Sequence, residues 1–86
     1  MDNRLVLLGI VVEEPESVEP LNNLLHEYRN YVVGRMGIPY RERNVSLISI
    51  VLDAPADAIN TLSGKIGMLP GVTAKAVYAK LPETSA

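Results

Sequence analysis

One short segment holds most of the side chains in this sequence that could bind a ligand. Residues 34–44, GRMGIPYRERN, contain three arginines, a tyrosine and two glycines, in a chain with eight basic residues. Guanidinium groups bind carboxylates and phosphates through paired hydrogen bonds, and glycine lets backbone approach a bound group closely. The segment therefore predicts an anion or small-metabolite site, or an oligomer contact. The candidate ligand-binding residues are Arg35, Gly37, Tyr40, Arg41 and Arg43. The alternative is a solvated hairpin loop in which Glu42 neutralises a neighbour.

The remaining side chains offer little catalytic or metal-binding chemistry. The sequence has no cysteine and one histidine, His26, so we expect no metal and no cofactor. His26 would also be the sole candidate for the histidine of a catalytic triad. The glycines at positions 64, 67 and 71 lack the GK[ST] ending of a phosphate-binding loop. We therefore expect a protein that is not an enzyme. The alternative is a small enzyme whose site combines His26, Tyr40 and an arginine from different chains.

Size and composition limit the chain to one globular domain. Its 86 residues are 48% apolar and have a formal net charge of −2. A domain this small buries only about 60% of its unfolded surface, so association with further copies adds stability. The negative charge gives no general attraction to nucleic acid. The apolar run that begins at Leu5 is too short to cross a membrane, and no signal cleavage site follows it. We expect a cytoplasmic protein without direct nucleic-acid or membrane contact.

Two similar halves of the chain must position these residues. Apolar runs predict strands over residues 5–12, 31–36, 45–52 and 72–80. Apolar side chains at steps of three and four predict one helix with Ser17 as its N-cap and another that begins at Pro55. Equivalent residues are forty positions apart, as Val12 and Leu52 are.

This repeat predicts the fold class. Two βαβ halves in tandem form a ferredoxin-like βαββαβ arrangement, an α+β two-layer sandwich. In that fold both helices cover one face of a four-stranded antiparallel sheet. We predict a single domain over residues 1–80 and a flexible C-terminal tail over residues 81–86.

Strand alternation predicts a sheet that is apolar on both faces. The set expected against the helices is Leu8, Ile10, Val12, Ile48, Ile50 and Leu52. The opposite set is also largely aliphatic, whereas a half-solvated antiparallel sheet normally alternates apolar with polar residues. At ~25 cal/mol per Å² of buried apolar surface, leaving this opposite set exposed would lose several kcal/mol of stabilisation.

We therefore predict sheet-to-sheet association into a two-fold dimer or a dimer of dimers. The expected interface residues are Leu7, Gly9, Val11, Leu47, Ser49 and Val51. The small residues Gly9 and Ser49 let a partner or a ligand approach closely, or they only ease packing.

Three stretches of the sequence resemble one family of bacterial proteins. They are VGRMGIPYRER at residues 33–43, DAPAD at residues 53–57 and LPGV at residues 69–72. The chain resembles the iron-only hydrogenase system regulators, sometimes grouped with CopG-type transcriptional regulators, from Arg4 to Lys80. That family is similar in fold to ACT domains and to the C-terminal domain of the nickel-responsive repressor. Those folds are regulatory and oligomeric, and they bind effectors at subunit interfaces.

The resemblance implies transcriptional or metabolic regulation linked to hydrogenase expression or maturation. The histidine and cysteine nickel ligands of the repressor have no counterpart here. Its ribbon-helix-helix arm is also missing, because the chain starts at the first strand. We therefore expect an oligomeric regulatory module, without nickel sensing or operator binding, that binds a small anionic effector or a partner protein. A structural interaction module without a small ligand is the alternative.

Overall fold

The structure, a computed structural model, describes residues 3–80 of the chain. Its helices and strands are β1 (Asn3–Val12), α1 (Val18–Glu27), β2 (Val32–Tyr40), β3 (Val45–Pro55), α2 (Ala56–Gly67) and β4 (Val72–Tyr78). Single 3₁₀ turns span Pro15–Ser17, Arg29–Tyr31 and Arg41–Arg43. The tail predicted over residues 81–86 lies outside the described residues.

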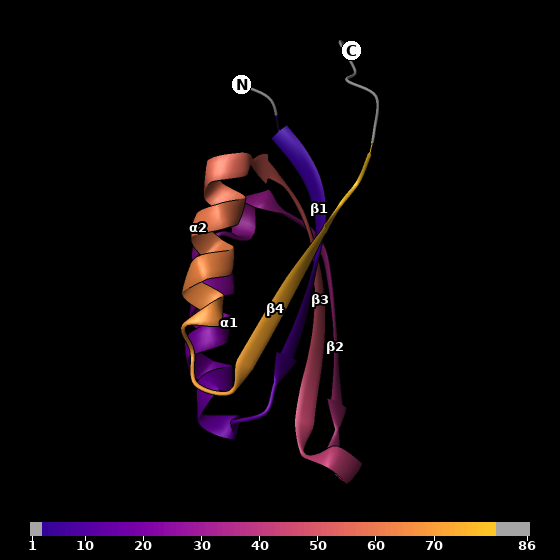
Figure 1. Cartoon of the computed structure of the whole chain (residues 1–86), viewed down its shortest axis with the longest axis vertical. Helices are drawn as coiled ribbons and strands as arrows, with labels where there is room; N and C mark the ends of the chain where they lie inside the picture. Colours follow the sequence, from indigo (N-terminus) through magenta and orange to yellow (C-terminus); the bar gives the residue numbers. More distant parts are fainter. Residues whose placement is uncertain (1–2, 81–86) are drawn as a thin grey trace.

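The four strands form one antiparallel sheet in the order β2-β3-β1-β4. Both helices lie on the same face of the sheet (Figure 1). The predicted ferredoxin-like α+β sandwich is therefore confirmed. β1 and β3 occupy the centre of the sheet, and β2 and β4 form its edges.

The core lies between the sheet and the two helices. All six residues predicted to face the helices are buried, and Leu8 and Ile50 are 0% exposed. The helices contribute their apolar stripes, of which the buried members are Leu21, Leu25, Ile59, Leu62 and Ile66. The alternation of β1 and β3 and the 3.6-residue period of the helices thus direct their apolar side chains into one core.

Strand β2 is longer than the sequence suggests. The prediction ended it at Met36, but pairing with β3 continues to Tyr40, opposite Val45. Gly37 and Pro39 therefore lie in the strand and not in the loop that the sequence predicts. A proline is tolerated here because β2 is an edge strand, where a missing backbone N–H leaves no gap in the ladder. β3 also extends beyond its predicted end and pairs Pro55 with Asn3.

The connections at the start of α1 and at the end of α2 are joined near the start of β4. Ser17 precedes α1 as predicted, but its side chain makes no capping hydrogen bond to that helix. Its hydroxyl donates instead to the backbone oxygen of Pro70, at 2.6 Å. The next residue, Gly71, has a φ of 67° and accepts a 2.7 Å hydrogen bond from the backbone N–H of Glu13.

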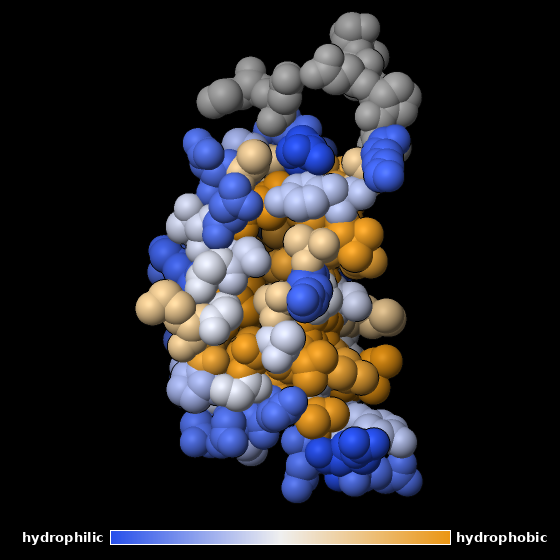
Figure 2. All heavy atoms as spheres, viewed as in Figure 1, coloured by the Kyte–Doolittle hydropathy of each residue, from blue (hydrophilic) through white to orange (hydrophobic). Residues whose placement is uncertain are grey.

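The second face of the sheet carries no helix, and we call it the open face. Its apolar members from the central strands are Leu5, Leu7, Val11, Val45, Leu47 and Val51. The edge strands add Met36, Ile38, Tyr40 and Val77, all of them exposed. Apolar side chains line the right-hand border of the molecule, away from the helices (Figure 2). The sheet is thus apolar on both faces, as the sequence predicted.

Candidate functional site

The candidate residues of the arginine-rich segment do not all lie together. Its first half belongs to β2, and its second half forms the 3₁₀ turn between β2 and β3. Arg35 pairs with Ile50 and Gly37 with Ile48, so both lie in register with the helix-facing set. Tyr40 pairs with Val45 and belongs to the open face. The five candidate residues are therefore divided between the two faces of the sheet and the turn.

A first hollow of about 190 Å³ lies where the β2–β3 hairpin approaches the start of α1. We call it the hairpin hollow. It is lined by Val12, Pro15, Val18, Pro39, Tyr40, Arg41, Asn44, Val45 and Ser46. Of the five predicted ligand-binding residues it includes Tyr40 and Arg41. Arg43 and Gly37 do not line it. An apolar wall with one guanidinium suits a small ligand that has a single anionic group.

The hairpin turn is fixed by Asn44. Asn44 has a φ of 56°, in the left-handed region, and its backbone N–H donates to the oxygen of Arg41 at 3.2 Å. Asparagine adopts this conformation more readily than other residues with side chains. The closed turn keeps Arg41 next to the hollow.

Tyr40 and Glu42 interact at the same turn. The hydrogen bond to the Glu42 carboxylate, together with partial burial, raises the pKa of the Tyr40 phenol above its ordinary value of 10.0. A carboxylate beside the phenol disfavours the second negative charge that ionisation would create. Tyr40 is 44% exposed. Within the hairpin, Glu42 therefore acts on Tyr40.

A second, larger hollow of about 350 Å³ lies at the β2 edge of the sheet, against α1. We call it the edge hollow. It is lined by Asn22, Leu25, His26, Arg29, Val32, Arg35 and Ile50. Sequence reasoning singled out Arg35 and His26 but missed Asn22 and Arg29. The spacing of Asn22, His26 and Arg29 could have indicated this group, because steps of four and three place side chains on one face of a helix.

The two hollows separate His26 from Tyr40. His26 lines the edge hollow, and Tyr40 lines the hairpin hollow. Within one chain, the histidine and tyrosine of the catalytic alternative thus line different hollows. Over residues 3–80, no group of three potential metal-ligating side chains lies together.

The residues predicted for the interface form a continuous row across the open face. Gly9 pairs with Ser49, and Leu7 pairs with Val51. Leu7 is 44% exposed and Leu47 is 40% exposed, which is high for leucines on central strands. Val11, Ser49, Val51 and Gly9 are half-buried.

None of the helices in the described part of the chain is long and apolar enough to span a membrane.

Most of the chain matches one known protein family. Residues 4–76 match the TM1266-like family, whose description is "Iron-only hydrogenase system regulator, putative". The chain belongs to this family. The family's description names a regulator and states no reaction. No curated protein matches the chain.

Solved structures agree with this assignment. The uncharacterized protein TM1266 from Thermotoga maritima is 38% identical, with a TM-score of 0.88, over 92% of this chain and 100% of that one. The C-terminal domain of the MgtC protein from Mycobacterium tuberculosis is 13% identical, with a TM-score of 0.67, over 91% and 89% of the two chains. A formyltetrahydrofolate deformylase from Pseudomonas putida KT2440 is 15% identical, with a TM-score of 0.62, over 85% of this chain and 28% of that enzyme. The last two share the fold alone.

Proposed function

We propose that this chain is a regulatory module of the iron-only hydrogenase system that pairs through its open face and binds a small anionic effector. Membership of the regulator family supports the regulatory role. The proposal rests on the open face. This face is the proposed pairing surface, and it carries Tyr40, which also lines the hairpin hollow.

The open face is too apolar for a solvated sheet. Its central residues Leu7 and Leu47 are flanked by exposed Met36, Ile38 and Val77 on the edge strands. Contiguous apolar surface of this kind marks an interface in soluble proteins. A second copy of the chain offers the same surface, and a two-fold pair buries both surfaces at once. Self-association is therefore the arrangement that removes the most apolar area from water.

The hairpin hollow is the proposed effector site. Tyr40 belongs to the open face and also lines this hollow, so pairing of two copies and occupation of the hollow affect the same residue. Such a shared residue lets an effector change the stability of the pair, and pairing then changes effector affinity by the same factor. Arg41 supplies the positive charge for the anionic group.

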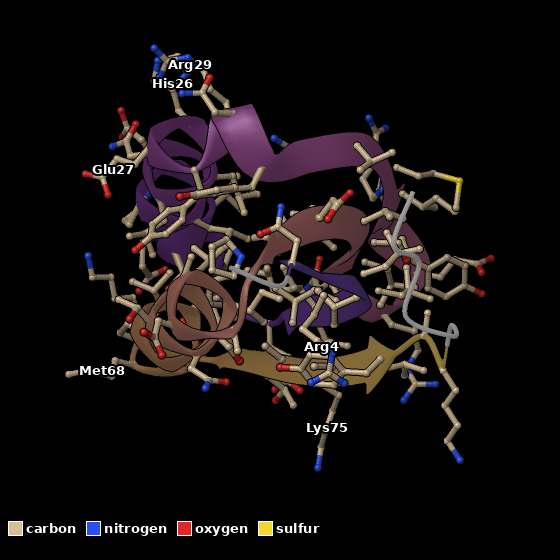
Figure 3. All side chains as sticks on the ribbon, turned by 90° about the horizontal axis from the view of Figure 1, so that it is seen from above. Arg4, His26, Glu27, Arg29, Met68 and Lys75 are labelled. Carbon is tan, nitrogen blue, oxygen red and sulfur yellow. The ribbon has the colours of Figure 1, made fainter. Side chains whose placement is uncertain are left out.

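Analytical ultracentrifugation of matched variants tests the pairing. Leu47→Asp places a charge on the open face, and Met68→Asp places the same charge on an 85% exposed methionine outside it. Figure 3 shows Met68 pointing away from the body of the molecule. We expect the unmodified chain and Met68→Asp to sediment as oligomers at micromolar concentration and Leu47→Asp to sediment as a folded monomer. A monomeric unmodified chain would refute the pairing.

The effector is tested separately by thermal-shift screening of carboxylates, amino acids and nucleotides against the unmodified chain and Arg41→Gln. We expect a stabilising anion whose effect is lost in Arg41→Gln but retained in Arg43→Gln, since Arg43 lies outside the hollow. Pairing without any stabilising ligand would favour the structural interaction module instead.

A further inference from the structure

The edge hollow has its own recognition chemistry. Its rim contains the side chains of Asn22, His26, Arg29 and Arg35, all exposed, and no acidic residue lines it. Figure 3 shows His26 and Arg29 together on one side of α1, with Glu27 directed elsewhere. Two guanidinium groups, an imidazole and an amide at one hollow form a group of hydrogen-bond donors suited to an anion.

The arginines of this rim are oriented by neutral groups. Arg35 donates from Nη2 to Oδ1 of Asn22 at 2.6 Å, across the gap between β2 and α1. Arg29 donates from Nη1 to the backbone oxygen of His26 at 2.9 Å. Neither hydrogen bond neutralises a guanidinium, and each group keeps further N–H donors beyond the one used. The rim therefore holds positive charge in a defined place.

The floor of the edge hollow is apolar. Ile50 is fully buried, Leu25 is buried, and Val32 is half-buried. A ligand in this hollow of about 350 Å³ would contact mainly Val32 with its apolar body, because Ile50 and Leu25 have almost no exposed surface, while its charged end meets the rim. The chemistry of the hollow thus selects molecules with one anionic end and one apolar end.

We propose that the edge hollow is a second anion-binding site, for a small molecule with a phosphate or carboxylate head and an apolar body. No open-face residue lines the hollow, so pairing through that face leaves it accessible. The two hollows also share no lining residue. This site therefore goes beyond the proposed effector site and does not depend on it.

Titration of the full chain by amide NMR tests the proposal. The probes are phenyl phosphate, benzoate and inorganic phosphate at constant ionic strength. We expect saturable shifts at the amides of residues 22–35, and several-fold tighter binding of phenyl phosphate than of inorganic phosphate because of the apolar floor. Tighter binding of phenyl phosphate than of benzoate identifies a phosphate head, and the reverse order identifies a carboxylate.

Variants that each remove one arginine charge test which arginines bind the anion. Arg29→Gln and Arg35→Gln should each weaken phenyl phosphate binding about tenfold, since a charge-assisted hydrogen bond is lost. Arg35→Lys keeps the charge without the fork and should fall between the unmodified chain and Arg35→Gln, and it serves if Arg35→Gln does not fold. Arg43→Gln makes the same charge change outside both hollows and should bind as the unmodified chain does.

Three results would overturn the second site. They are the absence of saturable shifts at residues 22–35, unchanged affinity in both glutamine variants, or an equal loss in Arg43→Gln. Shifts confined to residues 39–46 would place binding in the hairpin hollow, which would support the proposed effector site and refute this one.

Discussion

The hydroxyl of Ser17 donates a hydrogen bond to the backbone oxygen of Pro70, which lies 53 residues later in the chain. Ser17 is the one polar side chain buried among the described residues, at 1% exposure. The bond joins the connection that leads into α1 to the connection that leads out of α2. The adjacent bond from Glu13 N–H to Gly71 oxygen fixes the same junction through the backbone.

Removal of this hydroxyl should weaken the whole domain. We expect Ser17→Ala to lower the free energy of unfolding by about 1–3 kcal/mol, because the Pro70 oxygen loses its partner. Urea denaturation measures the change. Ser63→Ala, at a half-buried helical position in α2, is the control and should leave stability within about 0.5 kcal/mol. Equal effects of the two changes would mean that the hydrogen bond contributes nothing specific.

Two glycine-to-alanine changes should act in opposite directions. Gly71 has a positive φ, and a Cβ there would lie 3.1 Å from the backbone nitrogen of Glu14 and closer still to its side chain. We expect Gly71→Ala to destabilise the protein by about 1–3 kcal/mol. Gly64 lies within α2, where an added Cβ would meet open space, so Gly64→Ala should stabilise by about 0.5–1 kcal/mol. Thermal unfolding of both variants checks the signs.

The neighbours Leu7 and Leu8 should respond differently to truncation. Leu8 is fully buried against the helices, so Leu8→Ala should cost about 2–5 kcal/mol at every protein concentration. Leu7 lies on the open face, so Leu7→Ala should cost little in dilute solution and more where pairs form. Denaturation at several concentrations separates the two cases. A concentration-independent cost for Leu7→Ala would contradict pairing through this face.

Tyr40 should titrate above its ordinary pKa of 10.0 because of Glu42. A folded pKa above the unfolded one means that this contribution to stability is complete below about pH 10 and is lost as the pH rises through the folded pKa. Tyrosinate absorbance, taken as the difference from Tyr40→Phe, measures that pKa. Glu42→Gln should move it back toward the ordinary value, and Glu27→Gln, on α1, should not. A pKa that stays raised in Glu42→Gln would assign the effect to burial.

The sequence was most informative where alternation is regular. The predicted even-numbered residues of β1 and β3 were placed correctly against the helices because they form an uninterrupted aliphatic set, whereas the odd-numbered set includes Gly9 and Ser49. β2 was harder to predict, since Gly34, Gly37 and Pro39 are typical of loops. Between Val32 and Gly34 the register shifts, so that two steps of β2 match one step of β3. This irregularity sends Met36, Ile38 and Tyr40 to the open face, and no single-sequence pattern indicates it.

The candidate site shows the same limit. Arginines that are neighbours in the sequence are separated in space, because Arg35 belongs to a strand and Arg41 to the turn that follows it. The edge hollow joins Arg35 instead to Arg29 across a 3₁₀ turn and the edge of the sheet. Such groupings depend on tertiary packing, which composition and spacing along a segment do not specify.

The pairing of Gly9 with Ser49 has a geometrical consequence for assembly. These two residues are paired across the central strands and are also forty positions apart, the spacing that relates the two halves of the chain. The internal pseudo-dyad of the domain therefore passes between them, perpendicular to the sheet. In the proposed pair, rotation of one copy by half a turn about this axis exchanges Leu7 with Leu47 and Val11 with Val51. The exchange of Gly9 with Ser49 and the outer strands, with Met36 beside Ser49 and Lys75 beside Gly9, distinguish the two orientations.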